Sequence, residues 1–353
     1  GYGKDKKTVF NAAATEAANQ KLDAMKDAFA DWVWKDAERT DQLVQIFNDK
    51  FNTTVNRSFD GSHLTLPGAS KAFSVFDHVK RGAWRIIQKG NTYLAHAVGS
   101  GKTFQMVIAA MEQKRLGLIK KPMMVVPNHM LKQFAHEWQL LYPAARLMVA
   151  DEHNFHTDNR RRFVSRVALS DLDGVIITHS AFKLLDLDPE FKQKMINEQL
   201  EYMQAALLEA QGEEGGSGAK KKGERKSPRI KQIEKQIENL EQKLELAMSS
   251  VGKDTNVRFD ELGVDQIFVD EAHEYRKLEF ATARQVKGIS STGSARAFDL
   301  YMKSRYLEEK NPGRSLIMAS GTPVTNTLAE LYNVQRFMDR QGLIDRGIED
   351  FDS

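Results

Sequence analysis

The sequence of 353 residues contains no cysteine, and no apolar run approaches the ~20 residues that span a bilayer. The missing cysteine excludes disulfides and thiolate-bound metals. Residues 1–7 are basic, but the apolar stretch of a secretory signal does not follow them. The net charge of +3 is too small to indicate a nucleic-acid partner by itself. We therefore expect a cytoplasmic protein without membrane segments.

What is present indicates a globular α/β fold. A hydrophobic share of 41% and a charged share of 28% are typical of a chain with a buried core. From residue 92 onward, short continuous apolar stretches alternate with helical patterns, which predicts a parallel sheet covered by helices on both faces. The expected strands are residues 92–95, 123–126, 147–150, 175–178, 266–270 and 315–319. The expected helices between them include residues 104–111, 129–141 and 159–169.

Two segments depart from this alternation. Residues 8–57 have helical patterns, in which Trp32 and Trp34 are interpreted as packing aromatics. Within residues 186–256, apolar side chains recur every three or four positions, which predicts an inserted antiparallel coiled-coil hairpin. The hairpin tip, residues 212–228, is either a solvated loop or a basic fingertip that touches nucleic-acid phosphates. The expected division is an N-terminal helical region (1–66), the first part of the main domain (67–185), the hairpin (186–256), the second part (257–338) and a linker (339–353).

The stretch from His96 to Thr103 has the context of a phosphate-binding loop. A short strand precedes it and a helix follows it, as in a nucleotide-binding unit. Gly99, Ser100 and Gly101 would let backbone N–H groups surround phosphate oxygens, while Lys102 would reach the phosphates and Thr103 would bind Mg²⁺. His96 stands where the full motif has its first glycine, so a simple glycine turn with a chance Lys-Thr is the alternative.

Polar residues follow two further expected strands. Asp270 and Glu271 come directly after an apolar strand, where Asp270 would hold Mg²⁺ and Glu271 would orient and deprotonate a water molecule. His273 either couples this turn to the segment at Thr322 or caps the turn. Ser320, Gly321 and Thr322 follow the last expected strand, and by themselves they are ordinary turn residues.

Five segments together carry a family resemblance: residues 99–103, 127–138, 178–182, 270–273 and 320–331. In this order they resemble motifs I, Ia, Ib, II (a DEAH box) and III of superfamily 2 helicases. The form Ser-Gly-Thr-Pro-x-x-Asn-x-x-x-Glu-Leu is closest to the Swi/Snf-type DNA translocases. Within that group, the chain most resembles the helicase segment of large phage and plasmid proteins of the Dar antirestriction type, which also carry an adenine-specific DNA methyltransferase. The resemblance extends over residues 28–338.

The resemblance implies a bacterial or phage-encoded protein with two RecA-like P-loop lobes that bind ATP and Mg²⁺ in the cleft between them. This chain would supply the first lobe only, and the second would bring an arginine finger. The DNA partner, expected to be double-stranded, would lie against Pro127, Asn128, Thr178, His179 and Ser180. Ser320, Gly321 and Thr322, with His273, would couple DNA contact to ATP hydrolysis.

One position departs from the family pattern. The glutamine that senses adenine in these helicases would follow His78, but Val79 stands there, with Phe76 or Arg81 as substitutes. We therefore expect an ATP hydrolase of the translocase type whose adenine selectivity is open. The alternative is a nucleotide-gated scaffold whose coiled-coil arm docks a partner such as a methyltransferase. A metabolic phosphate-loop kinase is disfavoured, because kinases do not need the Ser-Gly-Thr-Pro strand end.

Overall fold

The computed structural model describes residues 58–348, except 73, 98, 151–154, 156, 216–226, 250–256, 280–292 and 323–327, together with scattered residues between 21 and 45. Gly1–Ser58 and Phe59–Ser353 form two compact units. In the first unit, most of the described residues are helical, as the apolar periodicity predicts. Trp32 is half-exposed and lies under the Arg39 guanidinium, 4.0 Å from the ring centre. Trp34 lies outside the described residues.

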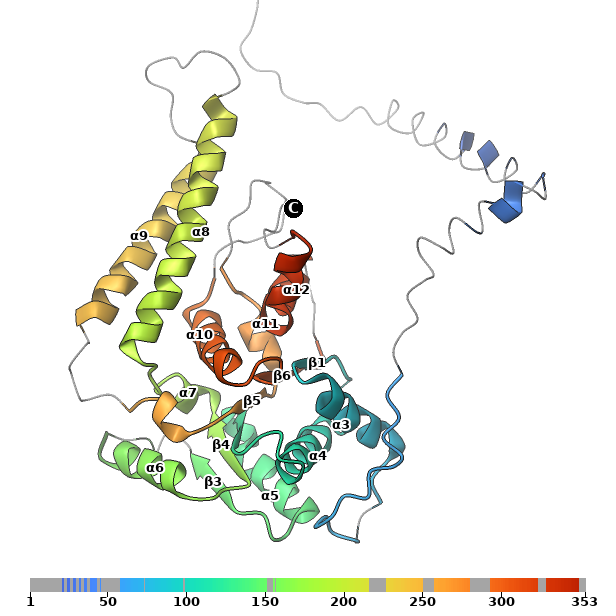
Figure 1. The fold of residues 1–353 in the computed structure, drawn as a ribbon, viewed down its shortest axis with the longest axis vertical. Helices are drawn as coiled ribbons and strands as arrows, with labels where there is room; N and C mark the ends of the chain where they lie inside the picture. The colour runs from blue at the N-terminus through green and yellow to red at the C-terminus, as the bar shows by residue number, and fades with distance from the viewer. Residues whose placement is uncertain are drawn as a thin grey trace, which may run out of the picture. The chain divides into compact units, whose positions relative to one another are not determined.

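The second unit is built on a six-stranded sheet with the order β1-β6-β5-β2-β4-β3 (Figure 1). Every neighbouring pair of strands is parallel. This confirms the predicted α/β fold, a RecA-like parallel sheet flanked by helices. The strands are β1 (Thr92–Leu94), β2 (Pro122–Val126), β3 (Leu147–Ala150), β4 (Gly174–Thr178), β5 (Gln266–Val269) and β6 (Leu316–Ala319).

Alternate residues of each strand point to opposite faces, so the sheet has two cores. Met124 and Val126 of β2 belong to the core that includes α3, α4 and α5. Met123 and Val125 belong to the core that includes α6, α7, α8, α9 and α10. These helices are α3 (Asp77–Lys89), α4 (Lys102–Arg115), α5 (Leu131–Leu141), α6 (Thr157–Leu169), α7 (His179–Phe182), α8 (Pro189–Gly215), α9 (Pro228–Ser249) and α10 (Ala295–Lys310). No helix in the described part of the chain is both long enough and apolar enough to cross a membrane.

Helices α8 and α9 lie side by side and form an arm inserted between β4 and β5 (Figure 1). The predicted apolar positions are buried between them and against the core, including Ile233, Leu240 and Met203. At the base of the arm, Phe259 donates its backbone N–H to Asp186 O at 2.6 Å, which joins the two ends of the insertion. The regular coiled-coil packing stays a prediction, and most of the tip lies outside the described residues.

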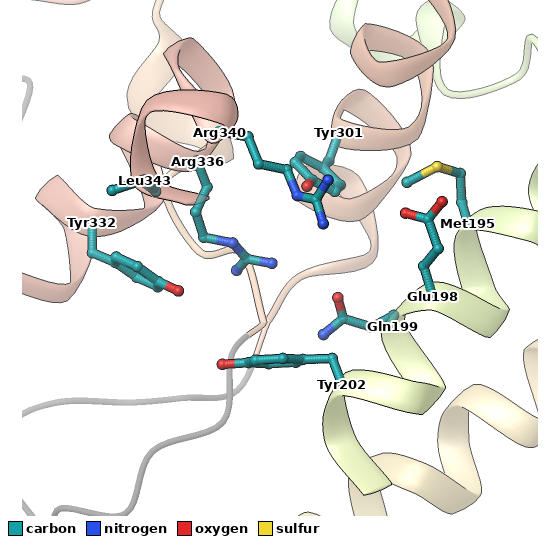
Figure 2. A pocket seen from close by; sticks show the side chains of 9 residues that line it. All are labelled: Met195, Glu198, Gln199, Tyr202, Tyr301, Tyr332, Arg336, Arg340 and Leu343. Atoms are coloured by element: carbon teal, nitrogen blue, oxygen red, sulfur yellow. The ribbon is translucent and has the colours of Figure 1, made fainter. Parts of the chain in front are cut away.

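The base of the arm also meets the last helices, α11 (Leu328–Met338) and α12 (Arg340–Asp345). A small cavity of about 50 Å³ lies between them, with tyrosine and arginine side chains pointing into it (Figure 2). The Arg336 guanidinium lies 5.5 Å from the Tyr301 ring centre and 5.7 Å from that of Tyr332. The arm therefore shares a cavity with α11, which precedes the expected linker, and with α12, which lies within it.

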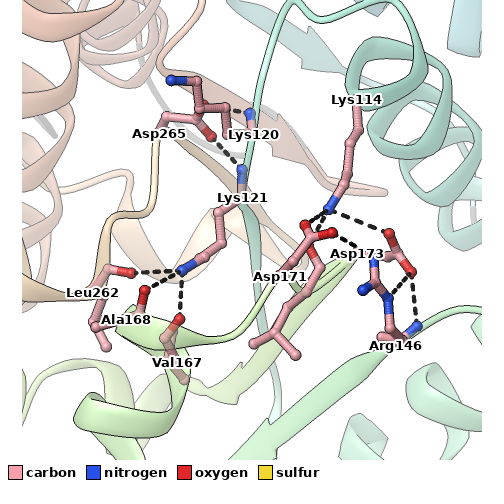
Figure 3. A network of polar contacts seen from close by, with 11 residues as sticks. Lys114, Lys120, Lys121, Arg146, Val167, Ala168, Asp171, Asp173, Leu262 and Asp265 are labelled. Carbon is pink, nitrogen blue, oxygen red and sulfur yellow. Dashed lines mark hydrogen bonds and ion pairs between the residues drawn. The ribbon is translucent and has the colours of Figure 1, made fainter.

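A buried lysine joins three elements at the edge of the sheet where the strands begin (Figure 3). Lys121 Nζ donates to the carbonyl oxygens of Val167, Ala168 and Leu262. Its backbone N–H donates to Asp265 at 2.9 Å. Burial lowers the pKa of Lys121, and the nearby Lys114 acts in the same direction. The Val167 and Leu262 carbonyl groups depend on this ammonium because they lie where water has little access.

We expect Lys121→Met to lower the free energy of unfolding by about 1–3 kcal/mol, because it leaves buried carbonyl groups without a donor. Urea unfolding monitored by circular dichroism measures the change. Lys120→Met is the matched control, since the neighbouring Lys120 side chain is exposed. Equal destabilisation by both substitutions would contradict this role of the ammonium.

Candidate functional site

The loop between β1 and α4 curls around the Lys102 ammonium. Gly99 and Gly101 have φ values of 79° and 73°, the left-handed region that favours glycine. A Cβ on Gly101 would lie 2.9 Å from Val79 Cγ2, so the close approach also requires glycine. Lys102 Nζ donates to the carbonyl oxygens of His96 and Ala97, each at 3.1 Å. The loop is thus folded with its cation turned toward its own backbone, the geometry of an anion-binding loop.

The polar groups of this loop fit a phosphate. The hydroxyl of Ser100 is buried and has no hydrogen-bond partner among the described residues. Lys102 and Thr103 begin α4, whose first turn contains no acidic residue, so its partial positive charge is not neutralised. The buried Gln105 donates to Ser100 O at 3.0 Å and fixes the loop from inside. Gln105 was not singled out in the sequence, where its only signal is a polar residue in an apolar run.

A cavity of about 450 Å³ opens beside the loop. It is lined by Phe59, His78, Arg81, Gly82, Arg85, Ala95, His96, Ala97 and Ser100. Of the two proposed substitutes for the missing glutamine, Arg81 lines this cavity, whereas the exposed Phe76 stacks on His78 with ring centres 5.7 Å apart. Burial lowers the pKa of His96, and the nearby Arg85 and Lys102 act in the same direction. The cavity is therefore lined by the cations Arg81 and Arg85 and by the His96 imidazole, whose neutral form is favoured.

The acidic turn follows β5. Asp270 is buried, and its backbone N–H donates to Val125 O at 2.9 Å. Burial raises the pKa of the Asp270 carboxyl; the hydrogen bond from the Glu271 N–H and the Lys102 cation oppose this effect, while the Glu271 charge adds to it. Glu271 has a φ of 51°, which is rare for a residue with a side chain. Such strain is common where a side chain has to be aimed. The turn thus directs one carboxylate toward the loop cation and holds the next in a costly conformation.

His273 connects the acidic turn to the end of β6. Its Nδ1 lies 2.9 Å from a carboxylate oxygen of Glu271 and 3.3 Å from Ser320 Oγ. Ser320 is buried, and its hydroxyl accepts the Thr322 N–H at 3.1 Å. Burial raises the pKa of Tyr93 to about 12, although its hydrogen bond to Ser320 acts in the opposite direction. The His273 ring therefore lies between the acidic turn and the end of β6, and its role in coupling stays a prediction. Gly321 lies beside Ser320.

The residues expected to contact DNA follow β2 and β4, which are neighbours in the sheet. Ser180 Oγ donates to Asn128 Oδ1 at 2.9 Å and lies 3.1 Å from Thr178 Oγ1. Asn128 is exposed, and Pro127 is half-buried beside it. His179 and Thr178 are both buried, with 6% and 2% of their surfaces exposed, and the His179 Nε2 lies 2.9 Å from Asp270 O. The His179 ring points into the protein.

Two further links were not anticipated. The fully buried Lys303 of α10 donates to Phe182 O at 2.9 Å and to Asp299 at 2.7 Å, which holds the end of α7. Arg276 pairs with the buried Glu330 at 3.3 Å, which joins the segment after the acidic turn to α11. The sequence pattern does not predict such pairs. Some partners are distant in sequence, and the others have the pattern of ordinary charged surface residues.

Five adjacent strands therefore carry the five motifs at one edge. In the sheet order β1-β6-β5-β2-β4, the strand ends lead to the phosphate loop, Ser320, Asp270, Pro127 and Thr178. No cluster of three or more His, Asp or Glu side chains suited to a metal is found in the described part of the chain. A magnesium site built from Thr103 and Asp270 would take its other ligands from phosphate and water, as Mg²⁺ commonly does.

The chain belongs to the family described as the probable helicase domain, whose model matches residues 84–353. A model of a domain of unknown function matches residues 2–53. The chain is similar to the defense against restriction protein B of Escherichia phage P1, with 23% identity over 364 residues, covering 92% of this chain and 16% of that protein. The predicted resemblance to helicases of the Dar type is thereby confirmed. The chain spans about one sixth of that relative's length.

Among solved structures, the chain is similar to the Sulfolobus solfataricus SWI2/SNF2 ATPase core in complex with dsDNA. The match has 14% identity and a TM-score of 0.39, and it covers 84% of this chain and 40% of that chain.

We expect protonation of His179 to limit stability in acid. Burial lowers the pKa of its imidazole from 6.5 to about 4, with Arg296 and His273 acting in the same direction and Glu274 opposing. The neutral ring contributes stability above pH 6.5, and the contribution declines as the pH falls toward 4, by about 3 kcal/mol in all. Urea unfolding across this range should show a shallower slope for His179→Gln, whereas His136→Gln, on the exposed side of α5, should keep the wild-type slope. Parallel slopes for wild type and His179→Gln would contradict the assignment.

Proposed function

We propose that this chain is the ATP-binding lobe of an ATP-dependent DNA translocase that hydrolyses ATP to move on or remodel double-stranded DNA. The observation that supports this most strongly is the set of five adjacent strand ends. A phosphate loop, an acidic turn, two hydroxyl-bearing segments and the Pro127–Asn128 segment lie along one edge of a parallel sheet. Ligands of such sheets bind at this edge. Membership of the probable helicase family supports the same reading.

In this proposal ATP binds with its phosphates in the loop of residues 99–103. Lys102 exchanges the carbonyl oxygens of His96 and Ala97 for phosphate oxygens, and the buried Ser100 hydroxyl gains an acceptor. Thr103 and Asp270 would hold Mg²⁺, which neutralises phosphate charge when bound. The cation would also favour ionisation of Asp270, whose pKa burial otherwise raises. The cavity beside the loop, lined by Arg81, is the proposed site for the rest of the nucleotide.

Glu271 is the proposed general base. It follows the proposed metal ligand directly, and its Oε2 is held 2.9 Å from His273 Nδ1. Since an ionised carboxylate only accepts hydrogen bonds, the imidazole donates to it and orients it. The other oxygen is left to accept a proton from an attacking water molecule. His273 also faces Ser320, so the same ring would sense movement at the end of β6.

The DNA surface in this proposal is formed by Pro127, Asn128 and Ser180, and the buried Thr178 supports it from behind, with its Oγ1 3.1 Å from Ser180 Oγ. Hydroxyl and amide groups at strand ends suit phosphate contacts, which do not depend on base sequence. A second RecA-like lobe elsewhere in the same protein would supply an arginine finger and close over the nucleotide. The similarity to the defense against restriction protein B supports a role in antirestriction, with an adenine methyltransferase as a proposed partner.

A nucleotide-gated scaffold is the alternative, in which the α8–α9 arm docks the partner. The two functions differ in turnover, because a scaffold binds ATP without needing a positioned base. The strained backbone of Glu271 supports turnover, because such strain is common where a side chain has to be aimed.

We expect Lys102→Ala and Glu271→Gln in the full-length protein to reduce ATP turnover by about a hundredfold or more, because one loses phosphate stabilisation and the other the base. Phosphate release in the presence of duplex DNA measures this. Glu274→Gln is the matched control, since Glu274 lies in the same turn but pairs with Arg296. Turnover near the wild-type rate in either test variant would reject the proposed function.

We also expect the isolated chain of 353 residues to bind ATP weakly and to show little DNA-stimulated hydrolysis, because half of the proposed cleft is absent. Titration with a fluorescent ATP analogue and a phosphate-release assay measure both properties. Strong stimulation by DNA in this chain alone would reject the requirement for a second lobe.

A further inference from the structure

His179 lies next to Ser180 of the proposed DNA surface but is itself buried. Its ring is buried and packs against Tyr275, with ring centres 5.3 Å apart. Its Nε2 lies 2.9 Å from the carbonyl oxygen of Asp270. Because a carbonyl oxygen only accepts hydrogen bonds, Nε2 carries the proton and donates it. The Nε2–H of His179 is therefore used in a hydrogen bond to the acidic turn.

The residues on either side of His179 connect it to the proposed DNA surface. The buried Thr178 accepts the Ala181 N–H at 3.2 Å and so caps the short helix α7, and its Oγ1 lies 3.1 Å from Ser180 Oγ. Ser180 donates to the exposed Asn128. A movement of the Ser180 hydroxyl group would turn the first residue of α7, which is His179. One helical turn thus joins a hydroxyl group that contacts an exposed residue to an imidazole that points to the interior.

The hydrogen bond from His179 reaches the peptide that controls Glu271. The Asp270 carbonyl belongs to the peptide group joining Asp270 to Glu271. The N–H of the same peptide donates to Asp270 Oδ1 at 3.0 Å. That peptide is therefore held on both sides, by an imidazole and by a carboxylate. It leads directly into the Glu271 backbone, whose φ of 51° needs such support.

We propose that His179 is a positioning residue that transmits contact at the DNA surface to the acidic turn by orienting the peptide between Asp270 and Glu271. This inference rests on the proposed function. It replaces the DNA contact expected for His179 from its sequence position. The link is made by the Nε2–H of His179, which donates to the Asp270 carbonyl oxygen at 2.9 Å.

The test uses the full-length protein and three variants. His179→Leu removes the donor at similar volume, His179→Gln keeps an N–H donor, and His136→Leu is an exposed control on α5. We expect the ratio of DNA-stimulated to basal ATP turnover to fall at least about tenfold in His179→Leu, because small displacements of reacting groups have large effects on rate. His179→Gln should recover most of the ratio, and His136→Leu should match wild type. The Kd for duplex DNA should stay within about twofold throughout, since no phosphate contact is lost.

An unchanged ratio with weaker DNA affinity would make His179 a DNA contact and overturn the inference, as would an unchanged ratio in both His179 variants. If His179→Leu does not fold, the wild-type protein still decides. Its His179 ¹⁵N resonances should show the Nε2-protonated tautomer and shift when duplex DNA binds, and unmoved resonances overturn the inference. Failure of the proposed function is recognised separately, because wild-type protein would then show no turnover that depends on Lys102.

Discussion

The common direction of the strands is the constraint on which the rest of this structure depends. β1, β6, β5, β2 and β4 are parallel neighbours, so residues distant in sequence meet at one edge because their strands end there. The order in space differs from the order along the chain. The phosphate loop lies two strands from the acidic turn, and Ser320 lies between them. His273 follows β5 and Ser320 follows β6. The two residues can meet because β6 is the neighbour of β5 in the sheet.

Within this edge, charged and polar side chains connect the acidic turn to the neighbouring strand ends. A buried carboxyl group with a raised pKa faces a lysine that donates to its own loop. Two histidines, His179 and His273, link the acidic turn to strand ends on either side. The hydrogen bonds that hold the turn come from one residue near the proposed DNA surface and one near the end of β6. The acidic turn is thus the meeting point of the network.

Much of the sheet could be predicted from sequence, because continuous apolar strands and their polar ends are local patterns. The phosphate loop, Asp270 and Ser320 were placed at strand ends for this reason. The direction in which a side chain points was harder to predict. His179 has the same sequence context as Ser180, and only the start of α7 determines that one ring turns inward. The role of Lys303 was missed because Phe182, whose carbonyl oxygen accepts from it, becomes its neighbour only when α10 packs on α7, although Asp299 lies one helical turn away in α10.

The arm illustrates a different property of the fold. Its two ends are joined at the base by backbone hydrogen bonds between Asp186 and the strand-like residues Val257 and Phe259. The two chain segments that leave and re-enter the sheet are therefore held together at the base of the arm, whatever the length of the arm. The entropy cost of a longer loop grows only slowly. An insertion of this kind can be lengthened, shortened or exchanged between related proteins as a cassette. The edge that carries the five motifs can stay constant while the arm varies.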